Sequence, residues 1–160
     1  MGSADTHHPP VVVRPAERRD IDQIVQIETL SFAHAGERFN EAKVRYLLGS
    51  RRMFVAVAEG EGRVLGWVAG FVWRRTAEPW GRIYALAVHP DARRRRVGSR
   101  LLHHAIEELR RRGARRIFLE ARAENHSAVA AYRKLGFVPC RDLADYYGRG
   151  LHAHRMVLSS

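Results

Sequence analysis

Cysteine, lysine and long apolar runs are scarce in this sequence, and their scarcity limits the classes of protein that it can belong to. Cys140 is the one cysteine, which excludes an internal disulfide and indicates a reducing, cytoplasmic location. Lysine occurs at Lys43 and Lys134 alone, so arginine carries nearly all of the positive charge. The longest apolar run, 64–73, is interrupted by glycines and is far shorter than the ~20 residues of a membrane-spanning helix. We therefore expect neither a disulfide scaffold nor a membrane protein.

Motifs of several functional classes are also missing. There is no Gly-x-Ser-x-Gly, Walker or paired-cysteine sequence and no internal repeat. His103 and His104 adjoin, and His152 and His154 share a strand face, but no third ligand stands at a suitable spacing, so we predict no metal site. The net charge of +11 would attract anions. Because no aromatic and basic platform accompanies the charge, nucleic acid is not the expected partner.

What is present indicates one α/β domain. A length of 160 residues with 46% hydrophobic content suits a single domain over 11–160, after a flexible tail at 1–10. Periodicity and cap signals predict strands and helices in alternation. The expected strands are 11–14, 53–58, 64–73, 83–88, 115–121, a segment around Val138 and 151–158, and the expected helices are 20–27, 41–49, 97–112 and a segment after Asn125. Cys140 is expected in a buried strand, as an inert thiol.

The segment from the 83–88 strand to the 97–112 helix carries the first functional signal. A turn and a run of four arginines connect the two elements directly. The start of a helix has unpaired backbone N–H groups and the positive end of the helix dipole. Small residues at Gly98 and Ser99 leave room beside these groups, so the loop is suited to bind an anion, most plausibly a phosphate.

This loop resembles that of the GCN5-related N-acetyltransferases, in which Gln/Arg-x-x-Gly-x-Gly/Ala holds the pyrophosphate of acetyl-coenzyme A. Arg93 to Gly98 occupies the motif, and Arg96 stands at its first glycine, where a side chain restricts φ while the N–H remains available. The resemblance implies acetyl-coenzyme A as co-substrate. It assigns the coenzyme to Arg93, Arg94, Arg95, Arg96, Val97, Gly98 and Ser99 and to the strand backbone at Leu86, Ala87 and Val88.

A second motif strengthens the resemblance and narrows it to the ribosomal-protein alanine N-acetyltransferase branch. Its pattern Glu-x-Arg-x-x-Asn-x-x-Ala-x-x-x-Tyr-x-x-x-Gly-Phe is met by seven residues, Glu120, Arg122, Asn125, Ala128, Tyr132, Gly136 and Phe137. The family fold is a mixed, mostly antiparallel twisted sheet of about seven strands with about four helices, split between the coenzyme strand and the next strand.

Three residues of this motif have both a chemical and a purely structural interpretation. Strand alternation places Glu120 on the face opposite Ile117 and Leu119. There it would either form a surface ion pair with Arg122 or, as the resemblance implies, act as the base that removes the amine proton. Tyr132 is either a core aromatic or the group next to the coenzyme sulfur. Asn125 is a helix cap that, by the resemblance, also contacts the coenzyme.

The acceptor is the least determined part of the site. In the family, the irregular segment 31–39 and the C-terminal glycine-rich turn border the acceptor, which implies roles for Phe32, Glu37, Tyr146 and Tyr147. Three carboxylates, Glu28, Glu37 and Glu41, would attract a basic acceptor if they converge. The expected acceptor is the N-terminal amine of a peptide or protein, with a small amine, a lysine or a non-catalytic coenzyme A-binding module as alternatives. The protein is expected to be a monomer or homodimer.

Overall fold

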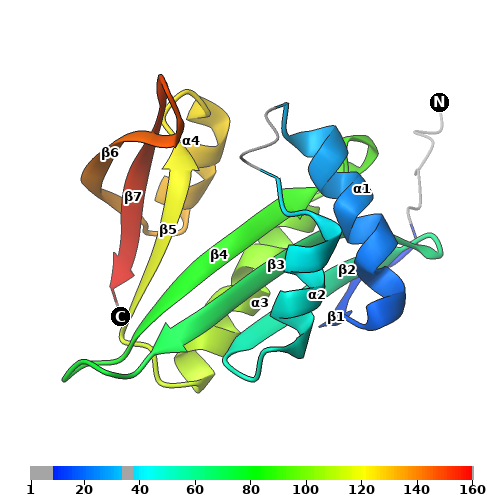
Figure 1. Ribbon diagram of the computed structural model, residues 1–160, viewed down its shortest axis with the longest axis horizontal. Coiled ribbons are helices and arrows are strands. Elements are labelled where there is room, and N and C mark those ends of the chain that lie inside the picture. Colours follow the sequence, from blue (N-terminus) through cyan, green and yellow to red (C-terminus); the bar gives the residue numbers. More distant parts are fainter. Residues whose placement is uncertain (1–8, 34–37, 160) are drawn as a thin grey trace, which may run out of the picture.

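The computed structural model of the protein describes residues 9–33 and 38–159. Four helices and seven strands alternate along the chain (Figure 1). In order, they are β1 (Val12–Pro15), α1 (Ile21–Ser31), α2 (Glu41–Gly49), β2 (Met53–Gly60), β3 (Arg63–Trp73), β4 (Trp80–Val88), α3 (Val97–Arg111), β5 (Arg116–Arg122), α4 (His126–Lys134), β6 (Val138–Gly148) and β7 (Leu151–Ser159). Short 3₁₀ turns precede α1, at Arg18–Asp20, and follow β4, at Pro90–Ala92.

The seven strands form one sheet in the order β1-β2-β3-β4-β5-β7-β6. Every neighbouring pair is antiparallel except β4 and β5, which are parallel because α3 crosses between them. The predicted α/β fold, with a mixed, mostly antiparallel sheet, is therefore confirmed.

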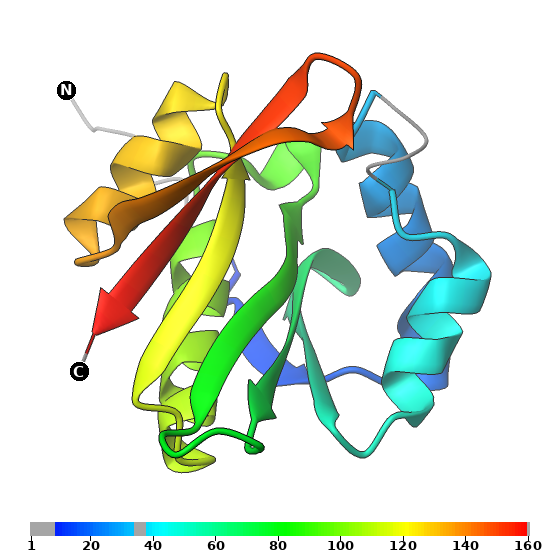
Figure 2. The same cartoon turned by 60° about the vertical axis from the view of Figure 1, so that its left-hand side comes forward.

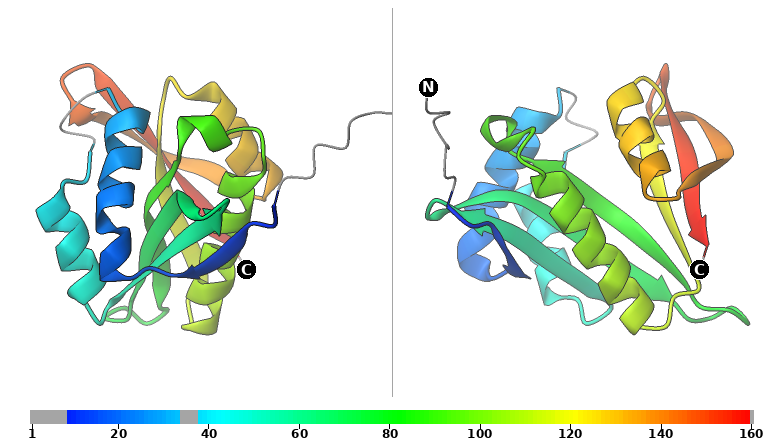
Figure 3. Two further views of the ribbon diagram at one scale, coloured as in Figure 1. Left: turned by 90° about the vertical axis from the view of Figure 1, so that its right-hand side faces the viewer. Right: turned by 180° about the vertical axis from the view of Figure 1, so that it is seen from behind.

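Helices cover the two faces of this sheet. Helices α1 and α2 pack over β2, β3 and β4 on one face, and α3 and α4 lie on the other (Figure 3). The apolar stripe of α3 explains its position, since every residue of the stripe is buried against the sheet. On the opposite face, Ile24 of α1 and Trp67 of β3 are completely buried in a second core.

Strands β4 and β5 part after a short stretch of pairing. Only Trp80–Arg82 pairs with Arg116–Phe118, and beyond that point the two strands diverge (Figure 2). Tyr84 is an extra residue in β4, because the register with β3 shifts between Ile83 and Ala85. Such a bulge bends and twists its strand, which explains the divergence. The predicted split in the sheet is confirmed.

Two local predictions for the C-terminal hairpin are wrong. Cys140 is exposed, and it lies on β6, the outer strand of the sheet. Tyr146 and Tyr147 belong to the end of β6, and the turn to β7 consists of residues 149–150. Both errors have the same origin, since the sequence does not show which strand lies at an edge.

Candidate active site

The loop between β4 and α3 presents an uncapped helix start. Arg96 is the N-cap residue of α3, and its side chain makes no capping hydrogen bond. The first amides of a helix have no partner within the helix, so those of Val97, Gly98 and Ser99 are suited to bind an anion. Ala92, which is buried, anchors the preceding 3₁₀ turn to the core.

The four arginines of this loop separate into two groups. Arg95 is partly buried and forms an ion pair with Glu61, Nη2 to Oε1 2.6 Å, which ties the loop to the β2–β3 turn. The other three, Arg93, Arg94 and Arg96, are exposed around the start of α3. Three exposed cationic residues thus stand within a few positions of the uncapped amides in the chain, and guanidinium groups are suited to bind a diphosphate.

Arg96 adopts the backbone conformation that glycine prefers. Its φ is +60°, in the left-handed region, where a Cβ atom is in steric conflict with the carbonyl. We expect Arg96→Gly to raise the free energy of unfolding by about 0.5–1 kcal/mol, because relief of this strain exceeds the added entropy of the unfolded chain. Urea denaturation would measure the change. Arg96→Ala retains a Cβ atom and should give no gain, and an equal gain from both variants would contradict the explanation.

A cavity of about 150 Å³ lies where β4 and β5 have parted. Its walls come from the end of α1, the bulged part of β4, β5 and the start of α4. Six of the residues predicted for the site line it: Phe32, Leu86, Glu120, Asn125, Tyr132 and Tyr147. Residues from opposite ends of the chain therefore meet in one space, large enough for several water molecules or for the first residue of a peptide.

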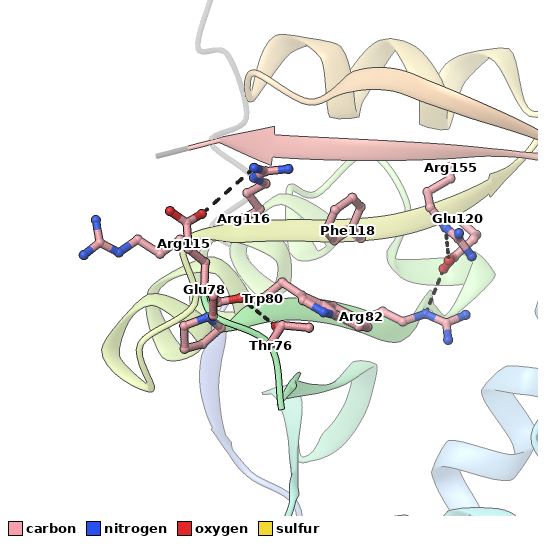
Figure 4. A pocket seen from close by; sticks show the side chains of 11 residues that line it. Thr76, Glu78, Trp80, Arg82, Arg115, Arg116, Phe118, Glu120 and Arg155 are labelled. Atoms are coloured by element: carbon pink, nitrogen blue, oxygen red, sulfur yellow. Dashed lines mark hydrogen bonds and ion pairs between the residues drawn. The ribbon is translucent and has the colours of Figure 1, made fainter. Parts of the chain in front are cut away.

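Glu120 is held between two arginines. Its Oε2 accepts from Nε of Arg82 and its Oε1 from Nε of Arg155, both at 3.0 Å (Figure 4). The side chain is only 5% exposed. Arg155 lies directly opposite Glu120 in the β5–β7 register, whereas Arg82 reaches it from β4. Arg122, the ion-pair partner that strand alternation offered as one alternative, contacts Glu124 at 3.7 Å.

Tyr132 and Asn125 form the α4 side of the cavity. The ring of Tyr132 packs edge-on against Phe137, with the centroids 6.2 Å apart. Burial raises the pKa of Tyr132 to about 12, so its hydroxyl remains a proton donor at neutral pH. Asn125 caps α4, because its Oδ1 accepts from the N–H of Ala128 at 3.1 Å. The predicted capping role of Asn125 is confirmed.

Glu28 is a functional candidate that the sequence prediction did not place at the centre of the site. It lines the cavity, is 1% exposed, and accepts a hydrogen bond from the N–H of Phe39. Burial raises the pKa of Glu28 to about 8. Its position was visible in the pattern, because it follows Ile24 by four residues and so belongs to the apolar face of α1. A carboxylate on a buried helix face is a functional signal.

The remaining acceptor candidates are distributed around the cavity. The hydroxyl of Tyr146 accepts from Arg82 Nη2 at 2.5 Å, and the ring of Tyr146 packs edge-on against Tyr147. Glu37 lies outside the described residues. Glu41 is exposed and pairs with Arg45 on α2, so it does not converge with Glu28.

A second cavity, of about 460 Å³, adjoins the first on the same side of β5. Glu120 lines both spaces. Figure 4 shows aromatic side chains in the second one, Trp80 and Phe118, whose rings meet edge to face at 5.7 Å. Four arginines and two glutamates complete the charged lining: Arg82, Arg115, Arg116, Arg155, Glu78 and Glu120. The lining is therefore cationic.

Two further features, a metal-ligand cluster and a membrane-spanning helix, are absent from the described part of the chain. No group of three or more potential metal-ligating side chains occurs among residues 9–33 and 38–159. In the same residues, no helix has both the length and the apolar character required to cross a bilayer.

The split sheet, the uncapped helix start and the cavity between them are the features that the sequence resemblance predicts. The family model of the Acetyltransferase (GNAT) family matches residues 21–137. This protein belongs to the GNAT family.

Similar proteins include enzymes that modify N-terminal amines. The [ribosomal protein bS18]-alanine N-acetyltransferase of Escherichia coli is 37% identical over 82 residues, 51% of this chain and 55% of the relative. This match thus spans about half the length of each protein. An N-alpha-acetyltransferase of Sulfurisphaera tokodaii is 29% identical over 91% of this chain and 90% of its own length. The crystal structure of the E. coli ribosomal-protein-S18-alanine N-acetyltransferase has a TM-score of 0.78 at 26% identity, covering 94% of both chains.

Proposed function

We propose that this protein transfers the acetyl group of acetyl-coenzyme A to the N-terminal α-amine of a peptide or protein. The observation that carries the proposal is the continuous path from the uncapped start of α3, along the unpaired part of β4, to the cavity at Glu120 and Tyr132. The names of the relatives support the same acceptor class.

The residues of the loop fit the coenzyme. A Cβ atom added at Gly98 would meet only Cγ2 of Val88, at 3.4 Å, so the space in front of the helix start is open. We propose that the amides of Val97, Gly98 and Ser99 and the exposed arginines hold the diphosphate, and that the unpaired edge of β4 at Leu86–Val88 holds the amide-rich pantetheine arm. We propose that the thioester then lies at the cavity.

We propose that Tyr132 donates a hydrogen bond to the departing thiolate. The removal of the amine proton by Glu120 stays a prediction from the sequence. Arg82 and Arg155 oppose this role, because a proton on Glu120 would break its ion pairs. The chemistry favours an α-amine. An α-amine with a pKa of about 7.7–8.0 is roughly one-tenth neutral at pH 7, whereas lysine, near 10.4, is neutral in about one molecule in 2,500.

A peptide panel with acetyl-coenzyme A tests the function. Mass spectrometry would locate the acetyl group on peptides that have a free N-terminus, a blocked N-terminus with an internal lysine, or both amines. We expect modification of free N-termini alone. Modification confined to lysine would contradict the proposed acceptor, and turnover of small amines without any peptide would establish the small-molecule alternative. Tight binding of coenzyme A without any turnover would establish a non-catalytic module.

The cationic second cavity predicts a preference among these peptides. We expect a peptide with an acidic residue among its first four positions to have a kcat/KM about tenfold higher than the same peptide with lysine at that position. The reason is that Arg115 and Arg116 are exposed at the cavity. The ratio should decrease at high salt, since salt screens exposed charges. Steady-state assays on the double variant Arg115→Glu and Arg116→Glu would check the cause. If the preference survives both changes, the second cavity does not contact the acceptor.

A further inference from the structure

Two carboxylates line the cavity between β4 and β5, and their surroundings differ. Both oxygens of Glu120 accept from arginine. Glu28 Oε2, in contrast, is buried and has no hydrogen-bond partner among the described residues. A buried carboxylate oxygen without a partner costs the folded protein free energy. A binding site tolerates such a group when its partner arrives with the substrate.

The position of Glu28 is well defined. It lies near the end of α1, where Ser31 donates a hydrogen bond to the carbonyl of Val88 and so links this helix to β4. The N–H of Phe39 holds one carboxylate oxygen, which leaves the other beside the cavity. Phe39 also packs edge-on against Tyr84 of β4, 5.4 Å between centroids, and closes the apolar wall around the carboxylate.

The other titratable and charged groups near Glu28 leave it without a compensating cation. The described residues that line the cavity with it include five such groups: Tyr84, Glu120, Arg122, Tyr132 and Tyr147. Arg122 contacts Glu124, and a tyrosine hydroxyl supplies no positive charge. The ammonium of Lys43 lies over the rings of Phe39 and Tyr84, 5.2 and 5.4 Å from their centroids. A cation that enters the cavity is therefore the natural partner of Glu28.

We infer that Glu28 binds the primary ammonium group of the acceptor and removes its proton before the nitrogen attacks. The inference rests on the proposed function and deepens it. One proton moves from the nitrogen to Oε2 of Glu28, and the freed electron pair forms the C–N bond to the thioester carbonyl carbon. The C–S bond then breaks, and sulfur leaves with its electron pair. A second proton passes from the nitrogen to the sulfur, and the proton on Glu28 is released to water.

The proton affinities of the two partners are matched. Burial raises the pKa of Glu28 to about 8, close to the 7.7–8.0 of a peptide α-amine. A base whose pKa lies near that of the group it deprotonates transfers the proton with little free-energy difference. Both oxygens of Glu120, in contrast, already accept hydrogen bonds from Arg82 and Arg155. We therefore assign the proton transfer to Glu28 and the positioning of the two arginines to Glu120.

The variant Glu28→Gln tests this assignment. It retains the shape of the side chain and an oxygen for the N–H of Phe39, but it cannot accept the proton. We expect kcat/KM for a peptide that begins with alanine to fall about 100-fold at pH 7. Affinity for acetyl-coenzyme A should remain unchanged in calorimetry. The matched control is Glu107→Gln, an exposed carboxylate on α3, which should retain wild-type activity.

A second acceptor separates proton removal from a structural effect. A peptide that begins with trifluoroalanine has an amine that is already neutral at pH 7, so it needs no base to become nucleophilic. We expect the ratio of wild-type to Glu28→Gln activity to shrink to about threefold for this peptide. An equal ratio for both peptides would overturn the assignment, as would a Glu28→Gln variant with wild-type activity. If the wild-type protein acetylates no peptide at all, the proposed function itself fails.

Stability measurements show independently whether Glu28 titrates in its buried position. A carboxyl group whose pKa is higher in the folded than in the unfolded protein binds its proton more tightly when folded. The free energy of unfolding should therefore decrease as the pH rises from about 4.5 to about 8. Glu28→Gln should remove this decrease, whereas an unchanged pH dependence would contradict the buried acid.

Discussion

Replacement of Gly98 by glutamate is expected to lower the affinity for acetyl-coenzyme A about a thousandfold, because several charge-assisted hydrogen bonds to the diphosphate would be lost. Gly98 lies in the first turn of α3, where its amide is free to bind an anion. A carboxylate at this position would occupy the same amides and repel the phosphates. Calorimetric titration with acetyl-coenzyme A would measure the loss.

The same substitution should not damage the fold. Glycine is a poor helix residue, and a negative charge near a helix start is favourable, so we expect the free energy of unfolding of Gly98→Glu to rise by about 1 kcal/mol. Binding and stability thus change in opposite directions. The control is Gly98→Ala, whose added Cβ meets only Val88, at an ordinary contact distance of 3.4 Å. Wild-type affinity in Gly98→Glu would show that the coenzyme binds elsewhere.

Replacement of Tyr132 by phenylalanine is expected to lower kcat about 100-fold, because the variant lacks the hydroxyl that would stabilise the departing thiolate. The ring itself should remain in place, since its contact with Phe137 does not involve the hydroxyl. Affinity for acetyl-coenzyme A and the KM for the peptide should therefore change little. Steady-state kinetics that follow the released thiol would separate the two effects.

Two results would argue against this role of Tyr132. One is a loss confined to KM, which would indicate that the hydroxyl binds substrate without assisting the reaction. The other is a loss of activity that sets in, as the pH rises, before about pH 11 and that Tyr132→Phe removes. The pKa of Tyr132 is raised to about 12, so its hydroxyl should stay neutral over this range. Tyr46→Phe is the matched control, since Tyr46 is 72% exposed on α2 and lies outside the cavity.

Local chemistry made the order and the limits of most elements predictable. Asn40 caps α2 and Asn125 caps α4, as the sequence pattern indicates. The apolar spacing in the sequence of α3 matches the residues that the fold buries, because a helix has a fixed period and buries one face: Val97, Leu101, Leu102, Ala105, Ile106 and Leu109. The loop that we propose as the diphosphate site was recognisable for the same reason, since Arg93, Gly98 and the helix start are neighbours in the chain.

Long-range contacts explain what sequence reasoning missed. Arg82 and Arg155 stand 38 and 35 residues from Glu120, so nothing in the local pattern shows that they neutralise it. Glu28 appeared to be one acidic residue among three, and only the fold brings it to the cavity where Glu120 and Tyr132 also lie. Cys140 was expected to be buried because an edge strand and a central strand have similar local sequences.

The sequence by itself determined the order of the helices and strands, the arginine-rich loop before α3 and, through the family resemblance, six of the residues that line the cavity. Helix periods, caps and strand alternation depend on residues close together in the chain, so these features could be derived without coordinates. Tertiary structure alone decided which carboxylate is neutralised and which is left without a partner. Charge, burial and proton affinity depend on every group within a few ångströms, and here those groups come from β4, β5, β7 and the end of α1.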